Sequence, residues 1–156
     1  MSSWQLFIRH AHRPTFDRDL DNGLSEKGQD QGRQLVKFLK KDGRLDKISA
    51  LYSSPKLRCL ETAAFVAEAT GLEVLIDEQL DERGRSESER DFVKRVKTFA
   101  DHALKMKRVC FFSHGDVLPF LAEIYGEEDV QIKKGDLFAL ENGKIRQINP
   151  IHSSGN

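Results

Sequence analysis

Four side chains that suit phosphoryl chemistry follow three of the predicted strands. Arg9 and His10 come directly after the first strand, and Arg58 lies in the first turn of the helix after the second. His114 follows the fourth strand. Because ligands bind beyond the carboxyl ends of parallel strands, we expect these side chains to meet at one sheet edge. Arginine forks bind phosphoryl oxygens, and a neutral imidazole can attack phosphorus, so these residues predict a phosphoryl-handling site.

Each of these residues also has a structural interpretation. A histidine at a strand end is often a polar cap, and either arginine could form a surface ion pair, as Arg58 could with Glu61 three residues later. The meeting of all four at one edge favours the chemical interpretation. His12 and Arg13, just after the first of these histidines, are predicted either to contact the substrate or to lie at the rim of the site.

The elements that must position these residues alternate between strands and helices. Short apolar runs predict strands at residues 4–8, 48–52, 72–76 and 109–112. Helical spacing predicts helices at residues 24–43, 54–70, 92–104 and 116–125. Ser54 is the expected N-cap of the second helix, with Pro55 at its first position and Gly71 at its end. The polar stretch 77–91 is expected to be a surface loop.

This order predicts an α/β fold with three layers. We expect a doubly wound, mostly parallel sheet with helices on both faces. Asn142-Gly143 between two apolar runs predicts a hairpin, which would form an antiparallel edge. The chain shows neither an internal repeat nor an interdomain linker. It therefore predicts one catalytic domain over residues 1–152, followed by a disordered tail at residues 153–156.

The composition narrows the class of protein. The chain has 156 residues, with 25 Lys and Arg against 25 Asp and Glu. A net charge of zero disfavours a nucleic-acid partner, while permitting a small basic patch. Neither a membrane span nor a secretory signal is recognisable. Cys59 and Cys110 are too few for a disulfide framework, which predicts reduced thiols and a cytoplasmic location.

Five short motifs lie in a recognisable order along the chain. They are Leu-Phe-Ile-Arg-His-Ala at residues 6–11, Leu-Ser-Glu-Lys-Gly with Gln-Gly at 24–32, Ser-Ser-Pro-Lys-Leu-Arg-Cys-Leu-Glu-Thr-Ala at 53–63, Leu-Asp-Glu at 80–82 and Ser-His-Gly at 113–115. Together they resemble the motifs of the histidine phosphatase superfamily, which includes the cofactor-dependent phosphoglycerate mutases. The resemblance spans residues 6 to about 126, nearly the whole chain.

The resemblance implies a role for each matched residue. His10 would be the nucleophile, and Arg9, Arg58 and His114 would bind the phosphoryl oxygens and stabilise the transition state. Glu82 would protonate the leaving oxygen and then activate water to hydrolyse phospho-His10. Its structural interpretation is a solvated loop carboxylate among other charged residues.

Two departures separate this chain from the mutases. Ala11 stands where the family usually has glycine, which would matter if the backbone there required a positive φ. Only 32 positions separate Glu82 from His114, whereas the mutases insert a larger lid segment. The compact form resembles the SixA-like phosphohistidine phosphatases. Without a lid the phosphoenzyme would be open to water, which favours hydrolysis.

The sequence therefore predicts a phosphatase that acts through phospho-His10 without a metal or organic cofactor. The expected substrate is phosphohistidine on a protein or a small phosphorylated metabolite. The alternatives are a phosphoglycerate mutase-like phosphotransferase and a catalytically weak phosphate-binding module. A zinc site built on His10, His12, His114 and Asp116 competes for the histidines, but nearby arginines would repel the cation. The oligomeric state is left open.

Overall fold

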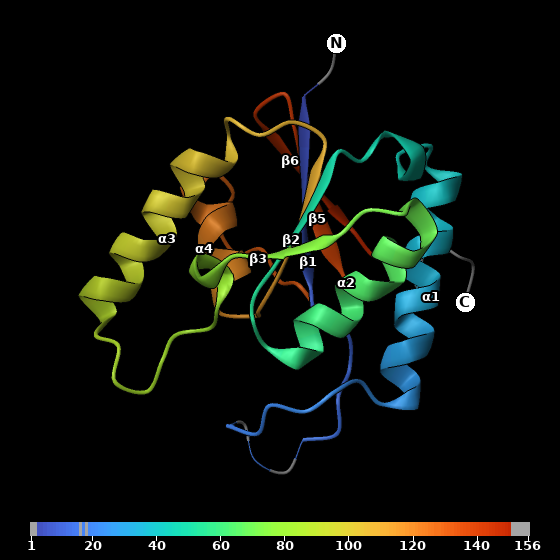
Figure 1. The fold of residues 1–156 in the computed structure, drawn as a ribbon. Helices are drawn as coiled ribbons and strands as arrows, with labels where there is room; N and C mark the ends of the chain where they lie inside the picture. The colour runs from blue at the N-terminus through green and yellow to red at the C-terminus, as the bar shows by residue number, and fades with distance from the viewer. Residues whose placement is uncertain (1–2, 16, 18, 151–156) are drawn as a thin grey trace.

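A six-stranded sheet forms the centre of the molecule. In the computed structural model, which describes residues 3–150 apart from residues 16 and 18, helices cover both faces of this sheet (Figure 1). The strands are β1 (Trp4–Arg9), β2 (Ala50–Ser53), β3 (Val74–Ile76), β4 (Val109–Ser113), β5 (Leu137–Glu141) and β6 (Lys144–Ile148). The predicted tail at residues 153–156 lies outside the described residues.

The strand order is β3-β2-β4-β1-β5-β6. β3, β2, β4 and β1 are parallel, each to its neighbour, whereas β5 pairs antiparallel with both β1 and β6. The predicted α/β fold with an antiparallel edge is confirmed.

The helices form two layers. They are α1 (Glu26–Lys41), α2 (Leu57–Thr70), α3 (Glu89–Ala103) and α4 (Val117–Ile124), with short 3-10 helices η1 (Leu45–Lys47) and η2 (Glu78–Leu80). α1 and α2 lie on one face of the sheet, and α3 and α4 lie on the other (Figure 1). None of the helices in the described part of the chain is long and apolar enough to cross a membrane.

The alternating side chains of β1 explain why both faces need cover. Leu6 and Ile8 pack in one buried cluster with Leu35 of α1 and other residues of α1 and α2. Phe7, between them in sequence, packs in the other cluster with Phe99 of α3. Successive side chains of a strand point to opposite faces, so a strand that is apolar throughout is stable only when helices cover both.

The predicted start of the second helix is wrong by a few residues. α2 begins at Leu57, with Lys56 as its N-cap residue and no side-chain cap. Ser54 still belongs to the strand exit, because its N–H donates to the carbonyl of Phe112 at 3.0 Å. The hydroxyl of Ser54 makes a tertiary contact, described below, and accepts a hydrogen bond from the N–H of Lys56, the residue before α2, at 3.3 Å. Pro55 therefore lies in the turn before the helix.

The other predicted helix boundaries agree more closely with the structure. Ser25 is the N-cap of α1 and accepts a hydrogen bond from the N–H of Gly28 at 3.0 Å. Gly71 ends α2 in the left-handed conformation, with φ of 78°. The stretch 77–91, predicted as a loop, also contains η2 and the first residues of α3.

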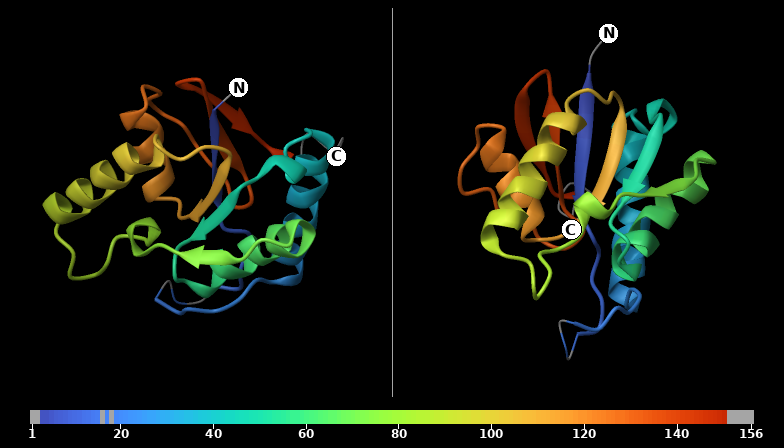
Figure 2. Two further views of the ribbon diagram at one scale, coloured as in Figure 1. Left: turned by 45° about the horizontal axis from the view of Figure 1, so that its top comes forward. Right: turned by 60° about the vertical axis from the view of Figure 1, so that its left-hand side comes forward.

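Four segments converge at one end of the sheet. β1, β2 and β4 end there at Arg9, Ser53 and Ser113. Because β5 runs in the opposite direction, the segment before Leu137 returns to the same edge. Figure 2 shows the chain after β1 and the loop before α3 extending from this end of the molecule.

Candidate active site

A pocket of about 310 Å³ lies at the carboxyl end of the parallel strands. It brings together all four residues that the strand positions singled out, and Glu82 with them. The residues that line it are Arg9, His10, Arg13, Thr15, Arg58, Glu82, His114, Gly115, Asp116 and Lys134. The predicted convergence at this edge is therefore what the structure shows.

His10 is buried and held as a neutral imidazole. Its Nδ1 lies 2.8 Å from the carbonyl oxygen of Ala11, which can only accept, so Nδ1 carries the proton and Nε2 keeps a free lone pair. Burial lowers the pKa of His10 from 6.5 to about 3, with Arg58 and Arg9 adding electrostatic repulsion of the imidazolium. A neutral imidazole with a free lone pair on Nε2 is able to act as a nucleophile at neutral pH.

The backbone conformation at Ala11 does not require glycine. The only described residues other than glycine that have positive φ are Arg108, Asp129 and Asn142. Ala11 is fully buried, and its N–H donates to Thr62 Oγ1 at 2.9 Å. The departure from the family's usual glycine therefore leaves the backbone beside His10 unstrained.

The guanidinium groups of Arg9 and Arg58 are fixed by different partners. Arg9 donates from Nη1 to the carbonyl of Ile132 at 2.8 Å. Gly115 lies against this guanidinium, since a Cβ at residue 115 would approach Arg9 Cζ to 2.7 Å. Arg58, only 2 % exposed, pairs with Glu82 at 2.8 Å. Its predicted alternative, a surface ion pair, is wrong because the side chain is buried.

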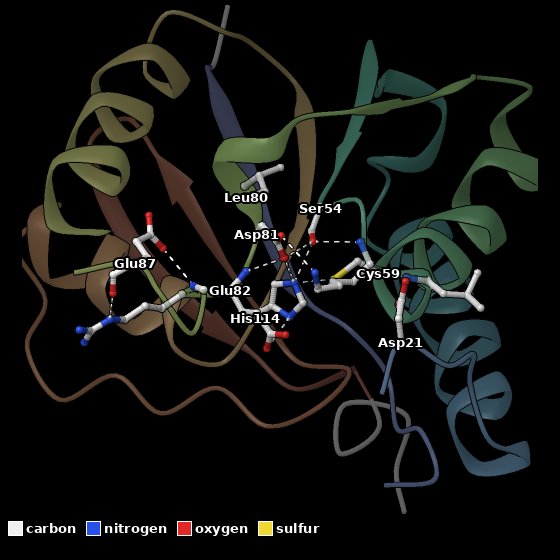
Figure 3. Close-up of polar contacts among 12 residues, drawn as sticks. Asp21, Ser54, Cys59, Leu80, Asp81, Glu82, Glu87 and His114 are labelled. Carbon is white, nitrogen blue, oxygen red and sulfur yellow. Dashed lines mark hydrogen bonds and ion pairs between the residues drawn. The ribbon is translucent and has the colours of Figure 1, made fainter. Parts of the chain in front are cut away.

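His114 faces the same pocket from the end of β4. Its Nε2 lies 2.8 Å from Ser54 Oγ and 3.5 Å from Cys59 Sγ (Figure 3). Its Nδ1 is buried without a hydrogen-bond partner, as is Nε of Arg58. Burial lowers the pKa of His114 to about 2, with Arg58 adding repulsion. Buried polar atoms that lack a protein partner are expected where a ligand supplies the partner.

Glu82 extends into the pocket from the loop after η2. Besides its pair with Arg58, its Oε2 lies 3.9 Å from His114 Nδ1 (Figure 3). Arg95 of α3 fixes this loop, since its Nη1 donates to the carbonyls of Gln79 and Asp81 at 2.8 and 2.7 Å. The carboxylate is therefore held at the pocket, in contrast to the alternative of a freely solvated loop residue. The sequence reasoning did not find Arg95, which acts through main-chain contacts that only the fold creates.

The two residues after His10 differ in position. Arg13 is buried and lines the pocket, and its Nη1 donates to the Leu20 carbonyl and to Asn22 Oδ1 at 2.8 Å. His12 is not among the residues lining the pocket. Its Nδ1 lies 2.6 Å from Ser25 Oγ, so the ring packs at the start of α1.

The pocket is also lined by Lys134, Thr15 and Asp116, to which the sequence analysis assigned no phosphoryl-binding role. The sequence did indicate where Lys134 lies, because the segment before an antiparallel edge strand returns to the carboxyl edge of its parallel neighbours. Among the described residues, no group of three His, Cys, Asp or Glu side chains could hold a metal ion. Three arginines, Arg9, Arg13 and Arg58, line the same pocket as His10 and His114.

Comparison with known proteins agrees with this geometry. Residues 6–85 match the family model of the histidine phosphatase superfamily (branch 1). "Putative phosphoserine phosphatase 2" of Hydrogenobacter thermophilus is 34 % identical over 88 residues, which cover 53 % of this chain and 41 % of that protein. The chain thus aligns with less than half of the length of this curated relative.

Solved structures show the same fold at low sequence identity. The protein histidine phosphatase SixA, complexed with tungstate, has a TM-score of 0.71 at 18 % identity, covering 96 % of this chain and 99 % of that one. Mycobacterial glucosyl-3-phosphoglycerate phosphatase has a TM-score of 0.69 at 18 % identity, covering 94 % and 97 %. With the family model matched over residues 6–85, the chain belongs to the histidine phosphatase superfamily.

Proposed function

We propose that this protein is a phosphatase that hydrolyses its substrate through a covalent phospho-His10 intermediate. One observation carries the proposal: a neutral His10 imidazole, with its proton fixed on Nδ1, lines a pocket that also holds Arg9, Arg58 and His114. The unpartnered, buried nitrogens of Arg58 and His114 in that pocket suit the binding of a phosphoryl group.

In the first step, His10 Nε2 attacks phosphorus and the bond from phosphorus to the leaving oxygen breaks. Arg9, Arg58 and His114 donate to the phosphoryl oxygens, and the carboxyl group of Glu82 gives a proton to the leaving oxygen. In the second step, Glu82 takes a proton from water as the water attacks phosphorus. The bond between phosphorus and Nε2 then breaks, which releases phosphate and restores neutral His10.

The short connection between Glu82 and His114 favours hydrolysis over transfer. It consists of the loop at residues 83–88, α3, a short turn and β4. None of these elements is an inserted domain of the kind expected of a mutase lid. A phosphoenzyme in a pocket that stays open to solvent is expected to react with water, so a mutase-like phosphotransferase is the weaker alternative.

Two substrate classes follow from the relatives and the site. The comparisons include both a protein histidine phosphatase and phosphatases named for small phosphorylated metabolites. Glu82 favours a phosphomonoester, since an alkoxide leaving group needs a proton donor. We also propose that residues 1–152 form one catalytic domain that needs neither metal nor organic cofactor, and that it is cytoplasmic, in keeping with the free, buried Cys59 and Cys110.

The test compares turnover of a generic aryl phosphate by the wild type and His10→Ala, with and without a chelator. We expect His10→Ala to abolish turnover, and His102→Ala, an exposed position on α3, to leave it unchanged. Undiminished activity of His10→Ala would overturn the mechanism, and loss of activity on chelation would overturn metal independence. A panel of phosphohistidine peptide, phosphoserine and phosphoglycerate then identifies the substrate class. Phosphate binding without hydrolysis of any of them would support a binding module.

A further inference from the structure

Lys134 is attached through its main chain to the residues that carry the nucleophile. It lies in the turn before β5, where Gly135 N–H donates to the carbonyls of Arg9 and His10 at 3.3 and 3.2 Å. On the other side of this turn, Arg9 N–H donates to the carbonyl of Asp136 at 2.9 Å. The position of Lys134 is therefore fixed relative to the backbone of His10.

The side chain of Lys134 lines the active-site pocket without an anionic partner. It is half-buried, and it forms no hydrogen bond or ion pair with any described residue. Burial lowers its pKa, and the positive charges of Arg9, Arg13, Lys27 and Arg58 lower it further. A cation held among cations costs free energy in the empty protein unless an anion binds beside it.

The environment of Lys134 differs from that of Lys56, another lysine near the site. Lys56 pairs with Asp81 at 3.3 Å, so its charge is already satisfied. Lys134 instead lines the same pocket as His10, and its charge adds to the lowering of the pKa of His10. An anion bound between His10 and these cations would relieve the repulsion among them.

We propose that Lys134 is a further substrate-binding residue, which contacts the phosphoryl group as it bonds to His10. This inference rests on the proposed function and adds a lysine to the two arginines, Arg9 and Arg58, that are proposed to contact the phosphoryl group. The hydrogen bonds that tie this turn to Arg9 and His10 come from main-chain atoms of Gly135 and Asp136, so they do not require the side chain of Lys134. The role of Lys134 is thus separable from folding.

The experiment measures inorganic phosphate binding by calorimetry and by thermal unfolding for the wild type, Lys134→Ala, Lys134→Arg and Lys133→Ala. Lys133 is the matched control, because it is the exposed neighbour in the same turn and does not line the pocket. We expect Lys134→Ala to raise the Kd for phosphate about tenfold, as for loss of one charge-assisted contact. Lys134→Arg should recover most of the affinity, and Lys133→Ala should bind like the wild type.

Thermal unfolding adds a readout that a purely structural role would not produce. Without phosphate, Lys134→Ala should have a Tm equal to or above that of the wild type, because repulsion among the cations is removed. With phosphate, its Tm should rise less than that of the wild type. A phosphate Kd within twofold of the wild type, or a lower Tm without phosphate, would overturn the inference. Phosphate binding without hydrolysis would instead contradict the proposed function and leave the role of Lys134 standing.

Discussion

The two buried imidazoles of the pocket should make the free energy of unfolding depend on pH. The pKa of His10 is lowered to about 3 and that of His114 to about 2 in the folded protein. In the unfolded chain both titrate near the ordinary value of about 6.5. Below that pH the unfolded state binds protons that the folded state does not, so stability present at pH 7 is lost as the pH falls toward the folded-state values.

The size of the effect follows from the unfolded-state titration. Between pH 7 and pH 5 each imidazole should lower the free energy of unfolding by about 2 kcal/mol, and the two together by about 4 kcal/mol. Staying at or above pH 5 keeps most carboxylates ionised in both states, since their ordinary pKa values are about 4. The histidines therefore dominate the change over this range.

The assay is urea unfolding at pH 7 and pH 5 of the wild type, His10→Gln and His114→Gln. Between pH 7 and pH 5, the free energy of unfolding of each variant should fall by about 2 kcal/mol less than that of the wild type. His102→Gln, at an exposed position on α3, controls for loss of a surface imidazole and should retain the wild-type dependence. NMR titration of the imidazole nitrogens then reports the two groups directly. Equal pH dependence in all four proteins would refute neutral, buried imidazoles at this site.

Two further predictions concern the acid and the packing of the site. Glu82→Gln should lower kcat for an alkyl phosphomonoester by about a hundredfold or more, with a much smaller effect on phosphohistidine peptide, and steady-state kinetics with equal losses on both would remove Glu82 as the proton donor. Gly28→Ala should destabilise the fold by about 2 kcal/mol in urea unfolding, since its Cβ would overlap the His12 carbonyl oxygen. Gly84→Ala is its control, because a Cβ there meets only Glu87 Cβ at 3.6 Å.

Much of the site could be predicted because it depends on strand order. Apolar runs followed by Arg9, His10 and His114 place these residues at one edge of any open parallel sheet, whatever the loops do. Arg58 was predictable for the same reason, since it enters with the first turn of α2. The order of the strands in the sheet therefore determines where these residues lie.

What the sequence could not supply depends on contacts between distant segments. Ser54 has the residue type of an N-cap, yet its hydroxyl contacts His114, sixty residues later. The position of Lys134 depends on the turn before β5, whose main-chain bonds to Arg9 and His10 join segments far apart in the sequence. Whether Arg13 or His12 faces the pocket depends on side-chain direction in an irregular segment, for which periodicity gives no rule.

The most direct test of the account is to trap the phosphoenzyme. Wild-type protein is mixed with an aryl phosphate, quenched within milliseconds in alkali, and digested for mass spectrometry under conditions that preserve phosphohistidine. We expect phosphate on the peptide that contains His10, stable in alkali and lost in acid, and no phosphate on this peptide in His10→Ala. Turnover with no phosphorylated peptide, or with phosphate on another residue, would contradict it.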